Sequence, residues 1–263
     1  MAVEVLSGKV FLLITGASQG IGRQIAVTFS ELLEPGSKLL LLALDEEGLK
    51  GTADKVSKHV SVDLKAVDLS VATADQLSEI IKKSVNPAQF DRIVITHNVA
   101  SMGDLSKLTT EMADFEYWRK YYDLNVFSPA VLNSVVMKLF KDNGKCKKVV
   151  INMTSHAGIL PVKCSGYYCS GKAAREMYFK VFAEEYPEVN VLNYSPGSVK
   201  TELFDTFRDT VADPGEQKKI HEMISNNQVL TTEQTVNRLV DILKNQLYKS
   251  GAHVDYHDKL STV

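Results

Sequence analysis

The feature that most constrains this 263-residue chain is an alternation of short apolar segments with longer segments of helical periodicity. The apolar segments show little of the apolar–polar alternation that marks half-exposed strands, which indicates strands covered on both faces. There are six of them: Val10–Thr15, Lys38–Ala43, Val62–Val67, Arg92–Thr96, Lys148–Met153 and Val189–Tyr194. Strands that alternate with helices in this way predict the α/β class and a parallel sheet.

Helical periodicity predicts helices near 21–33, 46–58, 73–85, 111–142, 167–186 and 232–246. Pro129 lies within the fourth of these segments and predicts a kink or break there. Six strands with intervening helices indicate a doubly wound sheet of the Rossmann type, with helices on both faces. No linker, internal repeat or low-complexity stretch interrupts the pattern, so we expect residues 1–263 to form a single domain.

The segment 200–230 departs from this pattern. It is polar, contains Asp213-Pro214-Gly215 and shows only weak helical periodicity. Long segments of this kind inside a compact domain often serve a function. We expect a mobile lid over a substrate site, and a plain surface insertion is the alternative.

Composition and charge exclude several classes of protein. Thirty basic residues against thirty-two acidic ones give no electrostatic reason to expect nucleic acid or an anionic membrane as a partner. The apolar runs are far shorter than the ~20 residues that span a bilayer. Cys146, Cys164 and Cys169 lack CxxC spacing, which indicates reduced thiols in a cytoplasmic protein. His97 has no second ligand at metal spacing, so we expect it to be structural and expect no metal site.

A glycine-rich loop follows the first predicted strand directly and opens the first helix. Glycine is needed where a chain turns tightly and where backbone approaches a diphosphate, and the helix start offers unpaired N–H groups to phosphates. The spacing Gly-x-x-x-Gly-x-Gly at this place predicts a dinucleotide site. We expect its contacts to come from Gly16, Ser18, Gln19, Gly20, Ile21 and Gly22.

The choice between NADPH and NADH is less clear from the residues. NADPH usually needs cationic side chains around its 2′-phosphate, yet the corresponding places hold Gln19 and Leu44, and Asp45 follows. Asp45 would repel a 2′-phosphate or accept from a free 2′-hydroxyl, unless Arg23 or Lys50 reaches the phosphate. We expect NADPH because cellular reductions favour it, and NADH is not excluded.

Asp68 ends the third predicted strand, where its carboxylate could accept a hydrogen bond from an adenine amino group. The alternative is that Asp68 caps the start of the following helix. The presence of the glycine loop at Gly16 favours the cofactor role.

Tyr168 and Lys172 stand four residues apart at the start of a predicted helix, so their side chains share a face. Carbonyl reduction needs a proton donor at the oxygen, and a nearby ammonium lowers the pKa of a phenol toward the working range. Ser155, at the end of the fifth strand, could hold the substrate oxygen. Asn125 could link Lys172 to a water-mediated proton path.

Downstream, Pro196-Gly197 follows the sixth strand, and Thr201 could contact the nicotinamide amide or the diphosphate. Together these motifs resemble the short-chain dehydrogenase/reductase family across nearly the whole chain. The resemblance implies a seventh strand at Ala252–Tyr256 and further cofactor contacts from the following residues: Leu69, Asn98, Tyr168, Lys172, Pro196, Gly197 and Val199. The family's usual Asn-Asn-Ala-Gly after the fourth strand is altered here to His97-Asn98-Val99-Ala100.

The segments 33–37, 102–107, 168–175 and 250–255 resemble a pterin-reducing branch of this family. This resemblance implies a cytoplasmic homodimer that uses NADPH to reduce pterin side-chain carbonyls in tetrahydrobiopterin biosynthesis. It also implies that Asp255 anchors the pterin, with Asp258 as a lower-ranked alternative, and that Ser155, Tyr168 and Gly197 contact the substrate.

Val162 and Ser165 stand where vertebrate members of the branch carry aromatic pocket residues, so the substrate range could differ. A broad-specificity carbonyl reductase is the alternative enzyme. A non-catalytic NAD(P)-sensing protein is the alternative from another class, although it would have no need of Asn125, Ser155, Tyr168 and Lys172.

Overall fold

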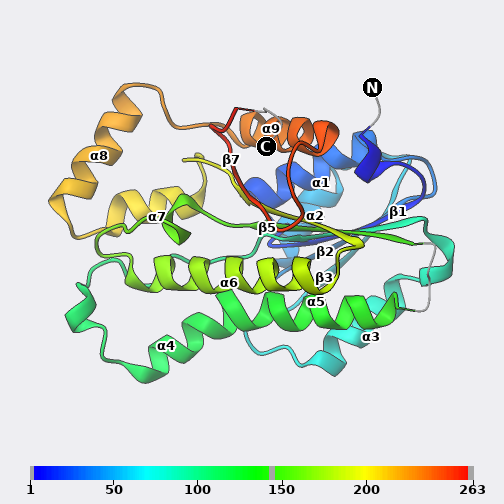
Figure 1. Cartoon of the computed structure of the whole chain (residues 1–263), viewed down its shortest axis with the longest axis horizontal. Helices are drawn as coiled ribbons and strands as arrows, with labels where there is room; N and C mark the ends of the chain where they lie inside the picture. Colours follow the sequence, from blue (N-terminus) through cyan, green and yellow to red (C-terminus); the bar gives the residue numbers. More distant parts are fainter. Residues whose placement is uncertain (1–2, 142–145, 260–263) are drawn as a thin grey trace.

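A computed structural model describes residues 3–141 and 146–259 of the chain. Its centre is a seven-stranded sheet in the order β3-β2-β1-β4-β5-β6-β7, with every neighbouring pair parallel (Figure 1). The strands are β1 (Val10–Thr15), β2 (Lys38–Ala43), β3 (Ser61–Ala66), β4 (Arg92–His97), β5 (Lys147–Met153), β6 (Val189–Ser195) and β7 (His253–Asp255). The α/β prediction is confirmed, and the strand order reverses between β1 and β4, as in a doubly wound sheet.

The helices cover both faces of this sheet (Figure 1). They are α1 (Gly20–Leu32), α2 (Glu46–Ala53), α3 (Ala74–Ser84), α4 (Phe115–Tyr122), α5 (Ser128–Leu139), α6 (Gly166–Glu185), α7 (Glu202–Thr210), α8 (Pro214–Ser225) and α9 (Thr232–Asn245). Helix α2 ends five residues before the predicted position 58, and its two glycines, Gly48 and Gly51, weaken it as a helix.

Each central strand contributes to two core layers, because successive side chains point to opposite faces. In β1, Leu12 and Ile14 pack in the layer under α1 and α9, whereas Phe11 and Leu13 pack in the layer under α3, α5 and α6. All six residues of β1 are buried. This double burial is the physical reason why the strand reads as continuously apolar in the sequence.

The long helix predicted over 111–142 is divided in the structure. Helix α4 runs into a five-residue π-helical turn, Asp123–Phe127, which is followed by α5. Pro129 lies in the first turn of α5 and lacks the N–H group of a helical hydrogen bond, and the hydroxyl of the preceding Ser128 donates to the Leu124 carbonyl. The predicted kink or break takes the form of this π-helical turn just before the proline, without interrupting the helix, and position 142 is outside the described residues.

The segment 200–230 forms two helices, α7 and α8, at one end of the molecule (Figure 1). The weak periodicity did not predict them, but both have side-chain caps: Thr201 accepts from the amide of Phe204, and Asp213 from the amide of Glu216. The amphipathic α7 turns Phe204 toward a small core cluster that includes Tyr168. The weakly periodic segment is thus ordered by its caps and by packing.

Candidate active site

The sequence-predicted residues gather at the carboxyl ends of the strands, which is where open parallel sheets place their ligands. The glycine loop follows β1, Asn98 follows β4, Ser155 follows β5 and Gly197 follows β6. Asp255 ends β7 itself. Parallel strands place all these ends at one edge of the sheet, so residues far apart in the sequence come together.

The glycine loop packs too tightly for larger residues at two of its positions. Gly16 has φ +64°, and a Cβ on Gly22 would lie 2.2 Å from the carbonyl oxygen of Gly16. Asn98 Nδ2 donates to the carbonyl oxygens of Thr15 and Gly16, both at 3.1 Å. The altered motif after β4 thus keeps the asparagine that fixes the loop against its neighbouring strand.

Helix α1 begins at this loop without a side-chain cap. Gln19 occupies the N-cap position, but its side-chain amide donates to Glu202 of α7. The first N–H groups of a thirteen-residue helix are therefore available to an anion. A loop with no room for a Cβ and an uncapped helix start fit the diphosphate of a dinucleotide.

The charged groups beyond the loop have partners of their own. Arg23 donates through Nε to Thr52 Oγ1 at 3.0 Å and through another guanidinium nitrogen to the carbonyl oxygens of Ser18 and Gly48. Lys50 pairs with two glutamates of its own helix, and Leu44 is 74% exposed. Arg23 is therefore the cation fixed between the glycine loop and the start of α2.

Asp68 does not cap the following helix, so that alternative is wrong. Its Oδ1 accepts from the amide and hydroxyl of Ser70, at 2.9 and 2.6 Å. Helix α3 is capped instead by Thr73, which forms a capping box with Gln76. Leu69 is buried in the core layer beside α3, so its side chain serves packing.

Tyr168, Ser155 and Lys172 come together in the structure. Tyr168 forms a side-chain hydrogen bond with Ser155, and the Lys172 ammonium lies 5.5 Å from the centre of the Tyr168 ring. Lys172 Nζ donates to the carbonyl oxygen of Met153 at 2.6 Å. Tyr168 and Ser155 line a cavity of about 250 Å³, which Val162 and Ser165 also line.

Burial controls the protonation of both groups on α6. It raises the pKa of Tyr168, and the hydrogen bond with Ser155 and the charge of Arg175 oppose this rise. Burial also holds the pKa of Lys172 well below its usual value, and repulsion by Arg175 adds to the effect. The predicted lowering of the Tyr168 pKa by the Lys172 ammonium stays a prediction.

Asn125 is buried in the π-helical turn, and backbone groups engage both ends of its amide. Its Oδ1 accepts from the amide of Ser101 at 2.8 Å, and its Nδ2 donates to the carbonyl of Tyr121 at 2.9 Å. Asn125 thus fixes the loop after β4 to the helix. Its predicted link to Lys172 through water stays a prediction.

The connection after β6 follows a fixed course across the site. Gly197 has φ +74°, a conformation that favours glycine. Val199 forms a parallel bridge with Leu230, which ties the two ends of the 200–230 segment together. Thr201 then caps α7. The cavity at Tyr168 is lined here by Pro196, Gly197, Val199 and Thr201.

A second cavity, of about 530 Å³, adjoins the first and shares Ser155 and Gly197 with it. Asp255 and Asp258 both line it. Asp255 Oδ1 accepts from the amide of His257 at 3.0 Å, while the amide of Asp255 donates to Asp258 Oδ2 at 2.8 Å. The Tyr168 and Ser155 hydroxyls of the first cavity and the carboxylates of the second thus lie in adjoining cavities that share part of their lining.

Comparison with known proteins identifies the family. A model of the short chain dehydrogenase family matches residues 10–212. The chain belongs to this family of oxidoreductases. It is 34% identical to a sepiapterin reductase of Xenopus tropicalis, over 98% of this chain and 100% of the relative. The sepiapterin reductase of Mus musculus is 32% identical, over 95% of this chain and 98% of the relative.

Among solved structures, a short-chain dehydrogenase/reductase from Saccharomyces cerevisiae has a TM-score of 0.79 and 24% identity, over 95% of this chain and 97% of its own. This likeness concerns the fold. It agrees with the seven-stranded parallel sheet and the helices on both of its faces.

Three residues of this dehydrogenase site were not predicted from the sequence. Glu216 of α8 is buried and lines the cavity at Tyr168. Glu176 joins three elements, because its carboxylate contacts Thr154, Lys180 and His253. Arg175 is fully buried beneath the site. The helical spacing could have predicted Arg175 and Glu176, because they lie seven and eight residues after Tyr168, near the same helix face.

Proposed function

We propose that this chain is a sepiapterin reductase, which reduces pterin side-chain carbonyls with NADPH in tetrahydrobiopterin biosynthesis. Its substrates would be sepiapterin and 6-pyruvoyl-tetrahydropterin. One observation carries the proposal: the cavity with Tyr168 and Ser155 adjoins a second one with Asp255, in a chain that matches sepiapterin reductases over nearly its whole length.

The glycine loop and the start of α1 would hold the cofactor diphosphate, with Asn98 fixing the loop. When bound, the nicotinamide supplies the hydride. The remaining cofactor contacts that we propose are Ser18, Gln19, Gly20, Ile21, Asp68, Leu69, Tyr168, Lys172, Pro196, Gly197, Val199 and Thr201. Arg23 supports NADPH, because its guanidinium is held beside Ser18 and Gly48, where it could attract a 2′-phosphate. The Asp45 carboxylate also lies close to Gly48 and would act against this attraction.

The proton moves at Tyr168 Oη. The phenol donates it to the substrate carbonyl oxygen, which the Ser155 hydroxyl holds by a hydrogen bond. Lys172 packs against the tyrosine ring and, through Met153, ties α6 to the end of β5. Asn125 keeps the adjoining loop in place. Burial excludes water from Tyr168, which is 8% exposed.

The pterin ring would extend past Gly197 into the second cavity. A 2-amino-pyrimidinone edge presents two N–H donors, and the Asp255 carboxylate can accept both. The chain would act as one domain, with 200–230 as a lid whose Phe204 and Glu216 line the first cavity. Closure of such a lid would shield the reacting carbonyl from water.

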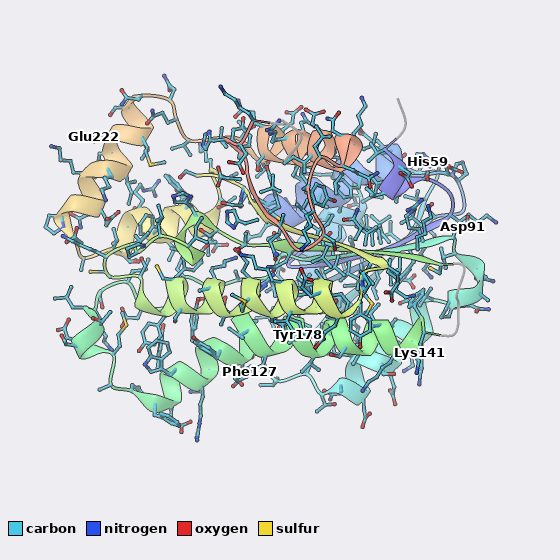
Figure 2. The ribbon with its side chains drawn as sticks, in the orientation of Figure 1. His59, Asp91, Phe127, Lys141, Tyr178 and Glu222 are labelled. Atoms are coloured by element: carbon cyan, nitrogen blue, oxygen red, sulfur yellow. The ribbon has the colours of Figure 1, made fainter. Side chains whose placement is uncertain are left out.

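A homodimer is supported by the outer face of the α5–α6 layer. Four apolar side chains of these elements are between 37% and 59% exposed: Phe127, Val131, Met177 and Val181. Several exposed apolar side chains on one layer are more typical of an interface than single scattered ones are. Figure 2 labels Phe127 and Tyr178 on this side of the sheet. A second copy would bury the patch, and Val181→Glu should shift the mass measured in solution from dimer to monomer.

A cytoplasmic location is supported by three free thiols, since disulfides are rare in that compartment. Among residues 3–141 and 146–259, no helix is long and apolar enough to cross a bilayer.

The decisive experiment is a turnover assay with sepiapterin, comparing NADPH with NADH. We expect NADPH-dependent reduction by the wild type and none by Tyr168→Phe. That variant should still bind NADPH, because it keeps the other proposed cofactor contacts and loses only the phenol oxygen. Lack of sepiapterin reduction by the folded wild type would refute the proposal. Full turnover by Tyr168→Phe would refute the mechanism alone.

A broad-specificity carbonyl reductase is the second candidate. Val162 and Ser165 line the first cavity where aromatic residues were expected to stack on a pterin ring, so Phe204 and Phe207 of α7 are left for that contact. Small dicarbonyls would then fit as well as pterins do. Faster turnover of such dicarbonyls than of sepiapterin would favour this candidate.

A further inference from the structure

Arg175 is a fully buried cation whose hydrogen-bond partners are all neutral. It is 1% exposed and is the largest of the fully buried side chains. Its guanidinium donates to Asn152 Oδ1 at 2.6 Å, to the carbonyl oxygen of Val99 at 2.9 Å and to that of His97. Among the described residues, no carboxylate forms an ion pair with it. Buried charges are usually paired, so an unpaired one requires an explanation.

The charge persists at neutral pH despite this burial, because desolvation lowers the pKa of Arg175 only to about 10. Burial and the repulsion by Arg175 lower the pKa of Lys172, and the charge of Glu176 opposes this lowering. The two residues lie three positions apart on α6, and burial of two adjacent like charges is costly. Arg175 is thus a fixed positive charge beside Lys172.

Arg175 lies on the same face of α6 as the proposed proton donor, Tyr168. Positions 168, 172 and 175 follow the i, i+4, i+7 spacing of one helix face, and helical side chains lean toward the N-terminus of their helix. The partners of Arg175 lie at the carboxyl ends of β4 and β5, where Ser155 begins the next turn. The charge of Arg175 is also among the groups that oppose the rise in the pKa of Tyr168.

The other titratable groups that face this region do not supply a free cation. His97 of β4 is fully buried, and desolvation lowers its pKa to about 3, so it is neutral. Burial raises the pKa of Tyr121 on α4 and of Cys169 on α6, which keeps both uncharged. The Glu176 carboxylate is engaged by its three partners, which include His253 of β7 and Lys180.

We propose that Arg175 is a positioning residue that stabilises the phenolate of Tyr168 when the phenol gives its proton to the substrate. The inference rests on the proposed role of Tyr168 as proton donor. Proton transfer leaves a negative oxygen in a buried site, and a permanent charge about two helix turns away lowers its energy without any rearrangement. Asn152, His97 and Val99 hold the guanidinium in place for this purpose.

The test is a titration of Tyr168 by NMR in protein labelled with ¹³Cζ-tyrosine, with Tyr168→Phe to assign the signal. This measurement does not need turnover. Arg175→Met should raise the pKa of Tyr168 by about one unit, the effect of one charge at ~10 Å in a medium of effective dielectric ~20. Arg175→Lys, which keeps a cation, should change it by less than half as much.

The matched control is Arg92→Met. Arg92 is also buried, but it binds Ser7 at the opposite end of β4. We expect its substitution to leave the pKa of Tyr168 unchanged. An equal shift in both variants, or no shift in folded Arg175→Met, would overturn the proposal.

Asn152→Asp gives a second route if Arg175→Met does not fold. It places a carboxylate on the guanidinium and keeps the acceptor for Arg175, although it removes the donor to Asn193 Oδ1, and it should likewise raise the pKa of Tyr168; an unchanged pKa in this variant would also overturn the proposal. The alkaline limb of kcat/KM for sepiapterin should move to higher pH by the same amount. If the wild type reduces no pterin, the proposed function fails, while the NMR titration still decides the role of Arg175.

Discussion

Gly22→Ala is the substitution whose consequence the structure defines most sharply. The new Cβ would lie 2.2 Å from the Gly16 carbonyl oxygen and 2.6 Å from Asn98 Nδ2. Contacts below 3.0 Å are essentially never seen for a real Cβ. The first of these atoms belongs to the backbone, so the loop and the start of α1 must separate by roughly 1 Å.

The magnitude follows from what that separation breaks. Asn98 holds the loop with two hydrogen bonds, each worth about 1 kcal/mol. Overpacking strain adds about 1–3 kcal/mol. We therefore expect the free energy of unfolding to fall by about 3–5 kcal/mol, which lowers Tm by roughly 6–10 °C in a chain of this size. NADPH affinity should fall at least about tenfold, because the N–H groups that bind phosphate move with the helix.

Thermal unfolding followed by circular dichroism, with and without NADPH, measures both effects. Gly51→Ala is the matched control: a Cβ at Gly51 would meet nothing within 4 Å, and the residue lies inside α2. That variant should gain about 0.5–1 kcal/mol and bind NADPH normally. If Gly22→Ala kept the wild-type Tm and NADPH affinity, the close packing of the loop would not be a requirement of the site.

Three further predictions concern charged groups. Asp45→Asn should raise the preference for NADPH over NADH about tenfold, since it removes a negative charge beside the expected 2′-phosphate; an unchanged ratio of kcat/KM for the two cofactors would contradict this. Asp255→Asn should raise KM for sepiapterin roughly 10–100-fold and spare small dicarbonyls; equal losses on both substrates would exclude the anchoring role. Burial alone would raise the pKa of Glu176, but hydrogen bonds from His253, Lys180 and Thr154 outweigh it and lower the pKa to about 2. The ionised Glu176 therefore adds about 3 kcal/mol to the free energy of unfolding. This stabilisation is complete above the ordinary pKa of 4.5 and is lost as the pH falls toward about 2. The free energy of unfolding of Glu176→Gln, measured across this pH range, should lack this loss.

Much of the architecture could be predicted because local sequence and global fold agree. Most of the strands are apolar on both faces because helices cover both, whereas β3 at the sheet edge is more polar and more exposed. All six predicted strands were placed to within one residue at either end. The helices α7 and α8 were not predicted. Both are short, and the polar Asp213-Pro214-Gly215 at their junction indicated irregular structure. In the fold, Asp213 caps α8, and the apolar side of α7 packs near Tyr168.

For the site, the sequence by itself determined which chemical groups are present and in what order: the glycine loop, Ser155, Tyr168 and Lys172. It also predicted that they would meet, because parallel strands bring their carboxyl ends to one edge. Only the tertiary structure decided their electrostatics. The pKa of a side chain depends on burial and on neighbours from other elements, and neither is visible in the spacing of residues. For that reason the sequence pointed only to Lys172 as a cation near Tyr168, and the fold added Arg175, a buried cation on the same helix.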